Sequence, residues 1–151
     1  IEDDLAKKRA KQNKSTSGNF AIMKGKLDWP IIGKVVSKFG LHTNPKLNTK
    51  IENLGIDIKT DRNAKIYPVL DGVVSIITYN REYGNMIIVS HGGGYHTVYA
   101  NVDNIMVNEN DYIQPDTNIG EVSKSNISNE HLLHFQIWKN ESKLNPEDWL
   151  K

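Results

Sequence analysis

The sequence predicts an all-β domain built from antiparallel sheets, and two observations support this class. From Phe20 onward the chain contains a series of short segments rich in β-branched and aromatic residues, the composition typical of strands. Gly, Pro, Asn and Asp separate these segments at fairly even spacing, and no long amphipathic helical pattern occurs after residue 20. Many short strands with regular turns favour a sandwich or a barrel.

The expected strands follow one another along the whole domain, and turn residues bound each of them. They lie in the segments VVSKF (35–39), GIDI (55–58), AKIYPVL (64–70), GVVSIITY (72–79), NMIIVSH (85–91), YHTVYANV (95–102) and HLLHFQIW (131–138). Two stretches, 64–78 and 109–123, each combine an apolar strand, a turn and a second apolar strand, which is the pattern of barrel-sandwich domains. At the C-terminus we expect one short helical turn, capped by Asn145, with Pro146 at its first position.

The N-terminal stretch has a different composition. Residues 1–14, IEDDLAKKRAKQNK, favour a short helix with acids before bases, and STSGN (15–19) reads as a break. We therefore expect a polar tail over 1–19, either a solvated linker or the end of a coiled coil, followed by one domain over 20–151. The chain begins at Ile1 rather than Met, which indicates a piece of a longer protein whose targeting signal could lie upstream.

Composition narrows the classes of function. The chain has 151 residues and a net charge of +1, from 19 basic and 18 acidic residues, so nothing in it indicates a nucleic-acid partner. No apolar run approaches the roughly 20 residues that span a membrane. The absence of Cys excludes a disulfide scaffold and any thiolate zinc site.

Several motifs occur together and in a fixed order, from about Lys26 to Lys151. They are WPIIGKVVSKFG (29–40), NLGID (53–57), PVLDGVV (68–74), YGNMIIVSHGGGYHTVYAN (83–101), NDYIQPDTNIGEV (110–122) and LLHFQIW (132–138). This order resembles the LytM, or lysostaphin-type, zinc endopeptidases. The resemblance implies a LytM-type barrel-sandwich of antiparallel sheets with a long groove between β elements.

Three short motifs build the zinc site in that family, and this sequence departs from each. His-x-Gly-x-Asp supplies two zinc ligands, but here it reads Asn53-Leu54-Gly55-Ile56-Asp57. Tyr-Ala-His supplies a catalytic His, but here it reads Tyr99-Ala100-Asn101. His-x-His-Phe-Glu supplies a catalytic His and then a ligand His, but here it reads Leu132-Leu133-His134-Phe135-Gln136.

These replacements predict that the domain uses no metal and is not an enzyme. A catalytic zinc ion usually has three protein ligands and one open position, whereas only Asp57 and His134 remain. The amide of Asn53 is a poor substitute for imidazole. Asn101 and Leu132 cannot accept and return protons at neutral pH. Asp57 and His134 could hydrogen-bond to each other or could bind a metal weakly, and we favour the hydrogen bond.

Other histidines are not expected to repair the site. Side chains alternate along a strand, which places Leu132, His134 and Gln136 on one face and His131 on the other. The same count, taken from Asn101, places His96 on the opposite face. We interpret His91 as a turn residue beside the Gly run and His42 as a loop residue.

The particular replacements look like those of EnvC-like murein hydrolase activators. That resemblance implies a non-catalytic domain that binds and activates a peptidoglycan amidase during cell-wall remodelling and daughter-cell separation, in the periplasm or cell envelope of a Gram-negative bacterium. Peptidoglycan itself is a further expected partner. The predicted partner groove is formed by Asn53, Asp57, Tyr99, Asn101, Leu132, His134 and Gln136.

Two alternatives remain at the level of sequence. The first is a zinc endopeptidase with an altered site that still cleaves peptidoglycan cross-links. The second is a passive peptidoglycan-binding or scaffold module. The contents of the Asp57–His134 groove are the feature that separates these hypotheses.

Overall fold

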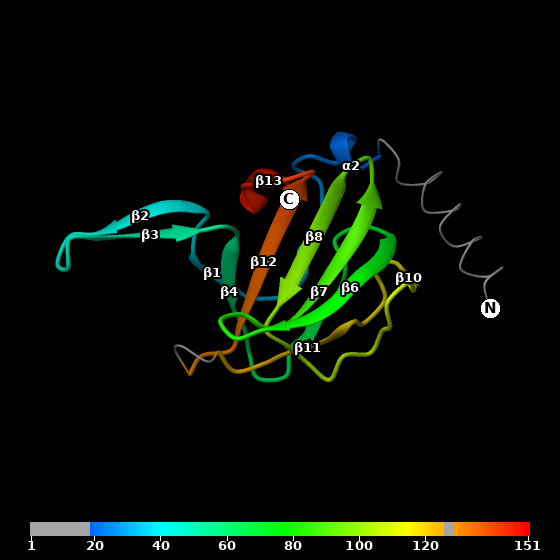
Figure 1. Cartoon of the computed structure of the whole chain (residues 1–151). Coiled ribbons are helices and arrows are strands. Elements are labelled where there is room, and N and C mark those ends of the chain that lie inside the picture. The colour runs from blue at the N-terminus through cyan, green and yellow to red at the C-terminus, as the bar shows by residue number, and fades with distance from the viewer. Residues whose placement is uncertain (1–18, 126–128) are drawn as a thin grey trace.

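The computed structural model describes residues 19–125 and 129–151, and Figure 1 shows their arrangement. The helix predicted over 1–14 lies outside the described residues. The described chain begins with a short helix, α2 (Asn19–Ile22), and is otherwise almost entirely strand and turn. This confirms the all-β class. Within the described residues, no helix is long and apolar enough to cross a membrane.

An eight-stranded antiparallel sheet dominates the described part of the chain (Figure 1). Its order is β1-β4-β12-β8-β7-β6-β10, and β13 pairs with β12 off this path. The strands are β1 (Lys34–Ser37), β4 (Ile56–Lys59), β6 (Gly72–Asn80), β7 (Gly84–Gly92), β8 (Tyr95–Ala100), β10 (Tyr112–Ile113), β12 (Leu132–Lys139) and β13 (Ser142–Leu144).

Two smaller sheets complete the domain. A three-stranded sheet has the order β5-β11-β9, formed by β5 (Lys65–Ile66), β11 (Gly120–Val122) and β9 (Val102–Asp103). The stretches 64–78 and 109–123 pair with each other, β5 with β11 and β6 with β10. Each stretch therefore contributes one strand to either sheet, rather than forming a hairpin of its own. The other small sheet is the hairpin of β2 (Gly40–Asn44) and β3 (Thr49–Asn53).

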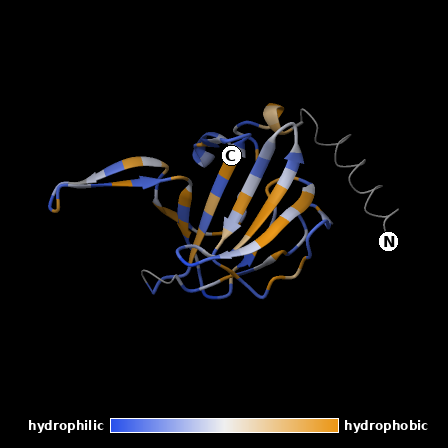
Figure 2. Ribbon diagram, viewed as in Figure 1, coloured by the Kyte–Doolittle hydropathy of each residue, from blue (hydrophilic) through white to orange (hydrophobic). Residues whose placement is uncertain are grey.

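The core lies against one face of the main sheet, and β12 shows how the sequence selects that face. Leu133, Phe135 and Ile137 are completely buried in the apolar core, whereas the alternate residues face the other side. Figure 2 shows the resulting alternation of hydrophobic and hydrophilic bands along the strands of the main sheet. Each such side chain contributes roughly 1.5–3 kcal/mol through its removal from water. This confirms the predicted alternation along β12.

The C-terminal turn also forms as predicted. Residues Pro146–Asp148 make a 3-10 helix, η1, with Pro146 in its first turn. The side chain of Asn145 caps it by accepting a hydrogen bond of 3.1 Å from the backbone N–H of Glu147. Trp149 then packs beside Phe20 of α2, so the two ends of the described chain meet in one aromatic cluster.

The structure corrects the interpretation of His91. This residue lies in β7 with no exposed surface, and its ring packs 4.9 Å from that of Phe20. Its Nδ1 lies 2.9 Å from the carbonyl oxygen of Asp71, and its Nε2 lies 2.7 Å from the hydroxyl of Thr97. The Gly run suggested a turn starting at 91, but β7 extends to Gly92 and the turn is shorter.

Acid is expected to destabilise the domain through His91. Burial lowers the pKa of His91 to about 4 from 6.5, opposed by its hydrogen bond to Asp71. The unfolded chain therefore binds a proton at His91 over the interval from pH 6.5 down to 4, while the folded chain does not. The free energy of unfolding should then fall by roughly 3 kcal/mol across that interval, with no further loss from this group below it.

Thermal unfolding between pH 7 and pH 3.5 measures this effect. The variant His91→Gln keeps a donor and an acceptor at this position but does not titrate. Its free energy of unfolding should fall less between pH 7 and pH 3.5 than that of the wild type, and this difference does not depend on how stable the variant is at pH 7. Equal pH dependence in the two proteins would show that His91 does not carry the effect.

Candidate functional site

Five of the seven predicted site residues line an open cavity of about 270 Å³. Asn53, Asp57, Asn101, Leu132 and His134 all line it, although they come from four separate strands or strand ends. Neighbouring strands explain the convergence, because β12 pairs with β4 on one side and β8 on the other. We call this cavity the groove.

Asp57 and His134 hydrogen-bond directly to each other at the floor of the groove. The register places them opposite one another on β4 and β12, so their side chains project from the same face. His134 Nδ1 lies 2.9 Å from Asp57 Oδ1. The exposed fraction of the His134 side chain is 6%, whereas that of Asp57 is 26%. The pair thus presents its carboxylate, rather than its imidazole, to the solvent.

Asn53 lies at the end of β3 and supports this pair with its amide. Its Oδ1 accepts a hydrogen bond of 3.1 Å from the backbone N–H of Gly55, a local turn that fixes the side chain. Its Nδ2 then faces the site and donates to Ser37 Oγ at 2.9 Å and to Asp57 Oδ2 at 3.1 Å. Asn53 therefore directs N–H groups, rather than a lone pair, at the position where the family has a ligand.

A chain of hydrogen bonds behind His134 fixes the proton on its ring. The indole Nε1 of Trp138 can only donate, and its bond of 2.7 Å therefore identifies the Gln136 atom beside it as Oε1. Gln136 then presents its NH2 group to His134 Nε2 at 2.9 Å, so this nitrogen must accept. The imidazole is consequently neutral, with its proton on Nδ1, and this proton is donated to Asp57.

These residues do not fit a catalytic zinc ion. A metal ligand must be deprotonated and have a lone pair available, but both ring nitrogens of His134 already have partners. Asn53 would have to turn its amide and break its bond with Gly55. Within residues 19–125 and 129–151, no group of three or more His, Asp or Glu side chains is placed to hold a metal.

Replacing Trp138 by Phe should release the fixed tautomer of His134. The variant removes the donor that orients Gln136, so the amide can turn and present Oε1 to the ring instead. The loss of one buried hydrogen bond should cost about 1 kcal/mol of stability. In the wild-type protein, NMR correlations of the ring should show protonated Nδ1 and unprotonated Nε2, and the variant should show a mixture of the two tautomers.

Trp29→Phe is the matched control for this experiment. Trp29 Nε1 donates to the carbonyl oxygen of Lys151, and neither residue lines the groove. Its replacement should leave the His134 signals unchanged. A fixed tautomer that persists in Trp138→Phe would show that Asp57 alone orients the ring.

Asn101 has become a structural link between segments. Its backbone lies in the left-handed region, with φ of 71°, where Asn is favoured over most residues. Its Nδ2 donates to the carbonyl oxygens of Ser123 at 2.8 Å and Leu132 at 2.7 Å. Asn101 thus holds the start of β12 beside the end of β8, and its amide protons are committed to the backbone.

Tyr83 is a site residue that the motifs did not reveal. It lies in the turn between β6 and β7, and its ring stacks on that of His134 at 4.5 Å with an angle of 14° between the planes. Burial raises the pKa of the Tyr83 hydroxyl, with smaller contributions from the negative charges of Glu82 and Asp57. Its covering of His134 depends on a hairpin tip that lies fifty-one residues away in sequence, which no local pattern indicates.

Two of the predicted groove residues do not line the groove. Tyr99 is completely buried on the core side, where its hydroxyl accepts from the backbone N–H of Val69 at 3.1 Å. Burial raises the pKa of Tyr99 to about 12. Gln136 is only 3% exposed and lies behind His134, where it acts on the ring rather than on the solvent. Motif membership did not distinguish these positions.

The structure also corrects the placement of His96. The register sets Trp138 opposite His96 and His134 opposite Ala100, so His96 lies on the same face of the sheet as His134. The count from Asn101 fails because β8 ends at Ala100 and Asn101 leaves the strand conformation. His96 nevertheless lies beside Trp138, 6.3 Å between ring centroids, and not in the groove.

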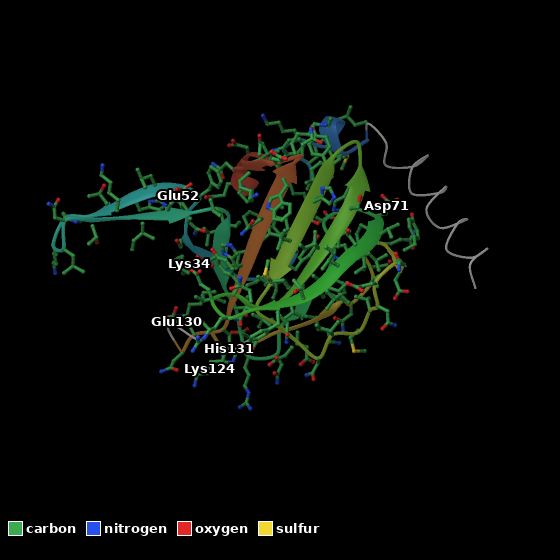
Figure 3. The ribbon with its side chains drawn as sticks, in the orientation of Figure 1. Lys34, Glu52, Asp71, Lys124, Glu130 and His131 are labelled. Atoms are coloured by element: carbon green, nitrogen blue, oxygen red, sulfur yellow. The ribbon has the colours of Figure 1, made fainter. Side chains whose placement is uncertain are left out.

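His131 stays apart from the groove, as the alternation predicts. It forms an isolated bridge with Lys124, and its carbonyl oxygen accepts a hydrogen bond of 2.9 Å from the Thr60 N–H. Figure 3 shows His131 near Glu130 and Lys124 at the lower end of β12. Its side chain is not among those that line the groove.

Fold and site together define a LytM-type domain with a degenerate zinc site, and the comparison with known families agrees. The profile of Peptidase family M23 matches residues 51–146, and the chain belongs to this family. A zinc-containing peptidase from Vibrio cholerae has a similar fold, with a TM-score of 0.72 and 19% identity over 82% of this chain and 40% of its own.

Two curated relatives have names that describe their role. The murein hydrolase activator NlpD of Escherichia coli is 32% identical over 81% of this chain and 30% of its own length. The murein hydrolase activator EnvC of the same organism is 24% identical over 90% of this chain and 32% of its own length. This chain therefore spans less than a third of the length of either relative.

Proposed function

We propose that this domain binds and activates a peptidoglycan amidase without cutting peptidoglycan itself. One observation carries the proposal: both ring nitrogens of His134 are taken up by hydrogen bonds, one to Asp57 and one to Gln136. Asn101 and Leu132 stand where the family has groups that transfer protons. The relatives named murein hydrolase activators support a role in cell-wall remodelling, and our proposal extends this role to daughter-cell separation.

The groove has the chemistry of a protein-binding surface. Its lining combines the ring of Tyr83 and the half-buried side chains of Leu132 and Ser37 with the carboxylate of Asp57. Apolar and aromatic groups set among polar and acidic side chains suit an amphipathic helix or an extended peptide. The domain boundaries that we propose are 1–19 for a polar tail and 20–151 for the binding domain. The names of the relatives favour the cell envelope as its location.

Substitution of Leu132 by Glu should abolish activation of the amidase. A new charge in the groove must lose its water when a partner binds, and a buried apolar contact at such a position is worth about 2 kcal/mol or more. We expect at least a tenfold loss of stimulated hydrolysis. The measurement is release of dye-labelled fragments from peptidoglycan by an amidase of the source organism, with and without the domain.

Met106→Glu is the matched control, because Met106 is 65% exposed and lies outside the groove. It should activate like the wild-type domain. Failure of the wild-type domain to stimulate any amidase of its organism would refute the proposal. Zinc-dependent cleavage by the domain alone would indicate an endopeptidase, and wall binding with no effect on the amidase would indicate a passive module.

A further inference from the structure

The β2–β3 hairpin forms an arm that projects from the domain (Figure 1). Its strands pair only with each other, in a register that runs from Gly40 opposite Asn53 to Asn44 opposite Thr49. Among the described residues, no third strand pairs with either of them. Both outer edges therefore present backbone N–H and C=O groups that another strand could pair with.

Side chains on the arm are unusually apolar for an exposed hairpin. Leu41 is 63% exposed, Leu47 is 70% exposed and Ile51 is 62% exposed. A two-stranded ribbon buries little of its own surface, so these side chains contribute little to folding. Exposed branched side chains next to an open strand edge are a characteristic of surfaces that bind other strands.

The outer part of the arm is basic. Residues 34–51 contain four lysines, at positions 34, 38, 46 and 50, and no Asp or Glu. Lys46 and Lys50 lie on the arm itself and are exposed. The first acid is Glu52, at the base of the arm (Figure 3). A partner strand with acidic side chains would complement this surface.

The arm and the groove are continuous. Ile51, Glu52 and Asn53, the last three residues of β3, all line the groove. Asn53 also donates to Asp57 at 3.1 Å, which ties the base of the arm to the floor of the site. A polypeptide seated in the groove therefore lies at the end of β3 and can extend along its edge.

We propose that the outer edge of β3 pairs with an extended, acidic segment of the protein that occupies the groove. Strand addition supplies main-chain hydrogen bonds, Leu47 and Ile51 supply apolar contacts, and Lys46 and Lys50 favour an acidic sequence. The inference rests on the proposed function for the identity of that protein. It adds a second contact beside the groove, in which main-chain hydrogen bonds along β3 hold the partner rather than side chains of the groove.

Hydrogen exchange on the complex tests the strand pairing directly. The probe is the purified catalytic domain of a peptidoglycan amidase from the source organism, added to the whole chain. Among Thr49–Asn53, the backbone amides that face away from β2 should exchange at least tenfold more slowly in the complex than in the free domain. Protection confined to the groove, for example to Leu132–Gln136, would overturn the inference and leave the proposed function intact.

Charge reversal on the arm tests the acidic segment. The double variant Lys46→Glu/Lys50→Glu should bind the amidase about tenfold more weakly at low salt and should lose most of the salt dependence. Its control, Lys26→Glu/Arg62→Glu, makes the same change of net charge at exposed positions away from the arm and should bind normally.

The outcomes separate the arm from the groove. Weak binding of Leu132→Glu with unaltered binding of the arm variant would refute the inference alone. Absence of amidase binding by the wild-type chain would refute both. If the arm variant bound the amidase normally and purified peptidoglycan weakly, the arm would contact the wall polymer, and the strand-addition inference would be wrong.

Discussion

Replacing Asn53 by His together with Gln136 by Glu is expected to give this domain a tightly bound zinc ion. A carboxylate at position 136 would accept a proton from His134 Nε2, which leaves the Nδ1 lone pair free for the metal. The side chain at position 53 already lies beside Asp57, whose other oxygen contacts His134, so an imidazole there completes a set of three ligands. The gain should be a full equivalent of zinc in metal analysis of the purified variant. With zinc in thousandfold excess over its dissociation constant, the variant should also be stabilised by about 4 kcal/mol.

The same variant should still fail to cleave peptidoglycan. Asn101 and Leu132 would continue to occupy the two positions where the family has proton-transferring histidines. Addition of Asp57→Ala to the variant should remove the zinc again, which controls for adventitious binding. A full equivalent of zinc in the wild-type domain would contradict the hydrogen-bonded arrangement of Asp57 and His134 described above.

Gly55→Ala should unfold or severely destabilise the domain. A Cβ at Gly55 would overlap the carbonyl oxygen of Phe135 and would lie 2.9 Å from the carbon of the same carbonyl. The Phe135 carbonyl belongs to the backbone of β12, and Gly55 directly precedes β4. Neither segment can move away without separating β4 from β12. We expect a loss of about 3 kcal/mol or more in the free energy of unfolding, or roughly 10 °C in melting temperature.

Chemical denaturation of the two proteins measures this loss. Ser75→Ala, at an exposed position on β6, is the control and should stay within about 0.5 kcal/mol of the wild type. Parting of β4 and β12 would also separate Asp57 from His134, so a variant that still folds should lose the ring signals of the bonded tautomer. A change below 1 kcal/mol would show that the two strands tolerate a wider spacing.

The fold was predictable because its determinants are local and ordered. The strand segments, the turn residues between them and the Asn145 cap all follow from short-range rules. Alternation gave the correct faces of β12, because that strand is long and regular. The same rule failed for His96, where the count crossed the end of β8, and the Gly run led to a wrong position for the start of the turn after His91.

The site was predictable only in part, because half of it is made by contacts between distant segments. Motif positions identified Asn53, Asp57 and His134, which the structure brings together. They gave no indication that Tyr83 covers His134 or that Trp138 fixes Gln136. Such roles depend on where a hairpin tip lies and on which atom of an amide faces a donor. The spacing of residues within a sequence motif indicates neither of these.

The two hydrogen bonds from the Asn101 side chain to backbone carbonyls have a consequence for any change of this residue to His. A His at this position could not donate twice from one nitrogen, so the change would leave the carbonyl of Ser123 or Leu132 without its donor. The loss of one of these buried hydrogen bonds costs about 1 kcal/mol. A single change of Asn101 to His would therefore cost stability while positions 53 and 132 still lacked the residues that could use it.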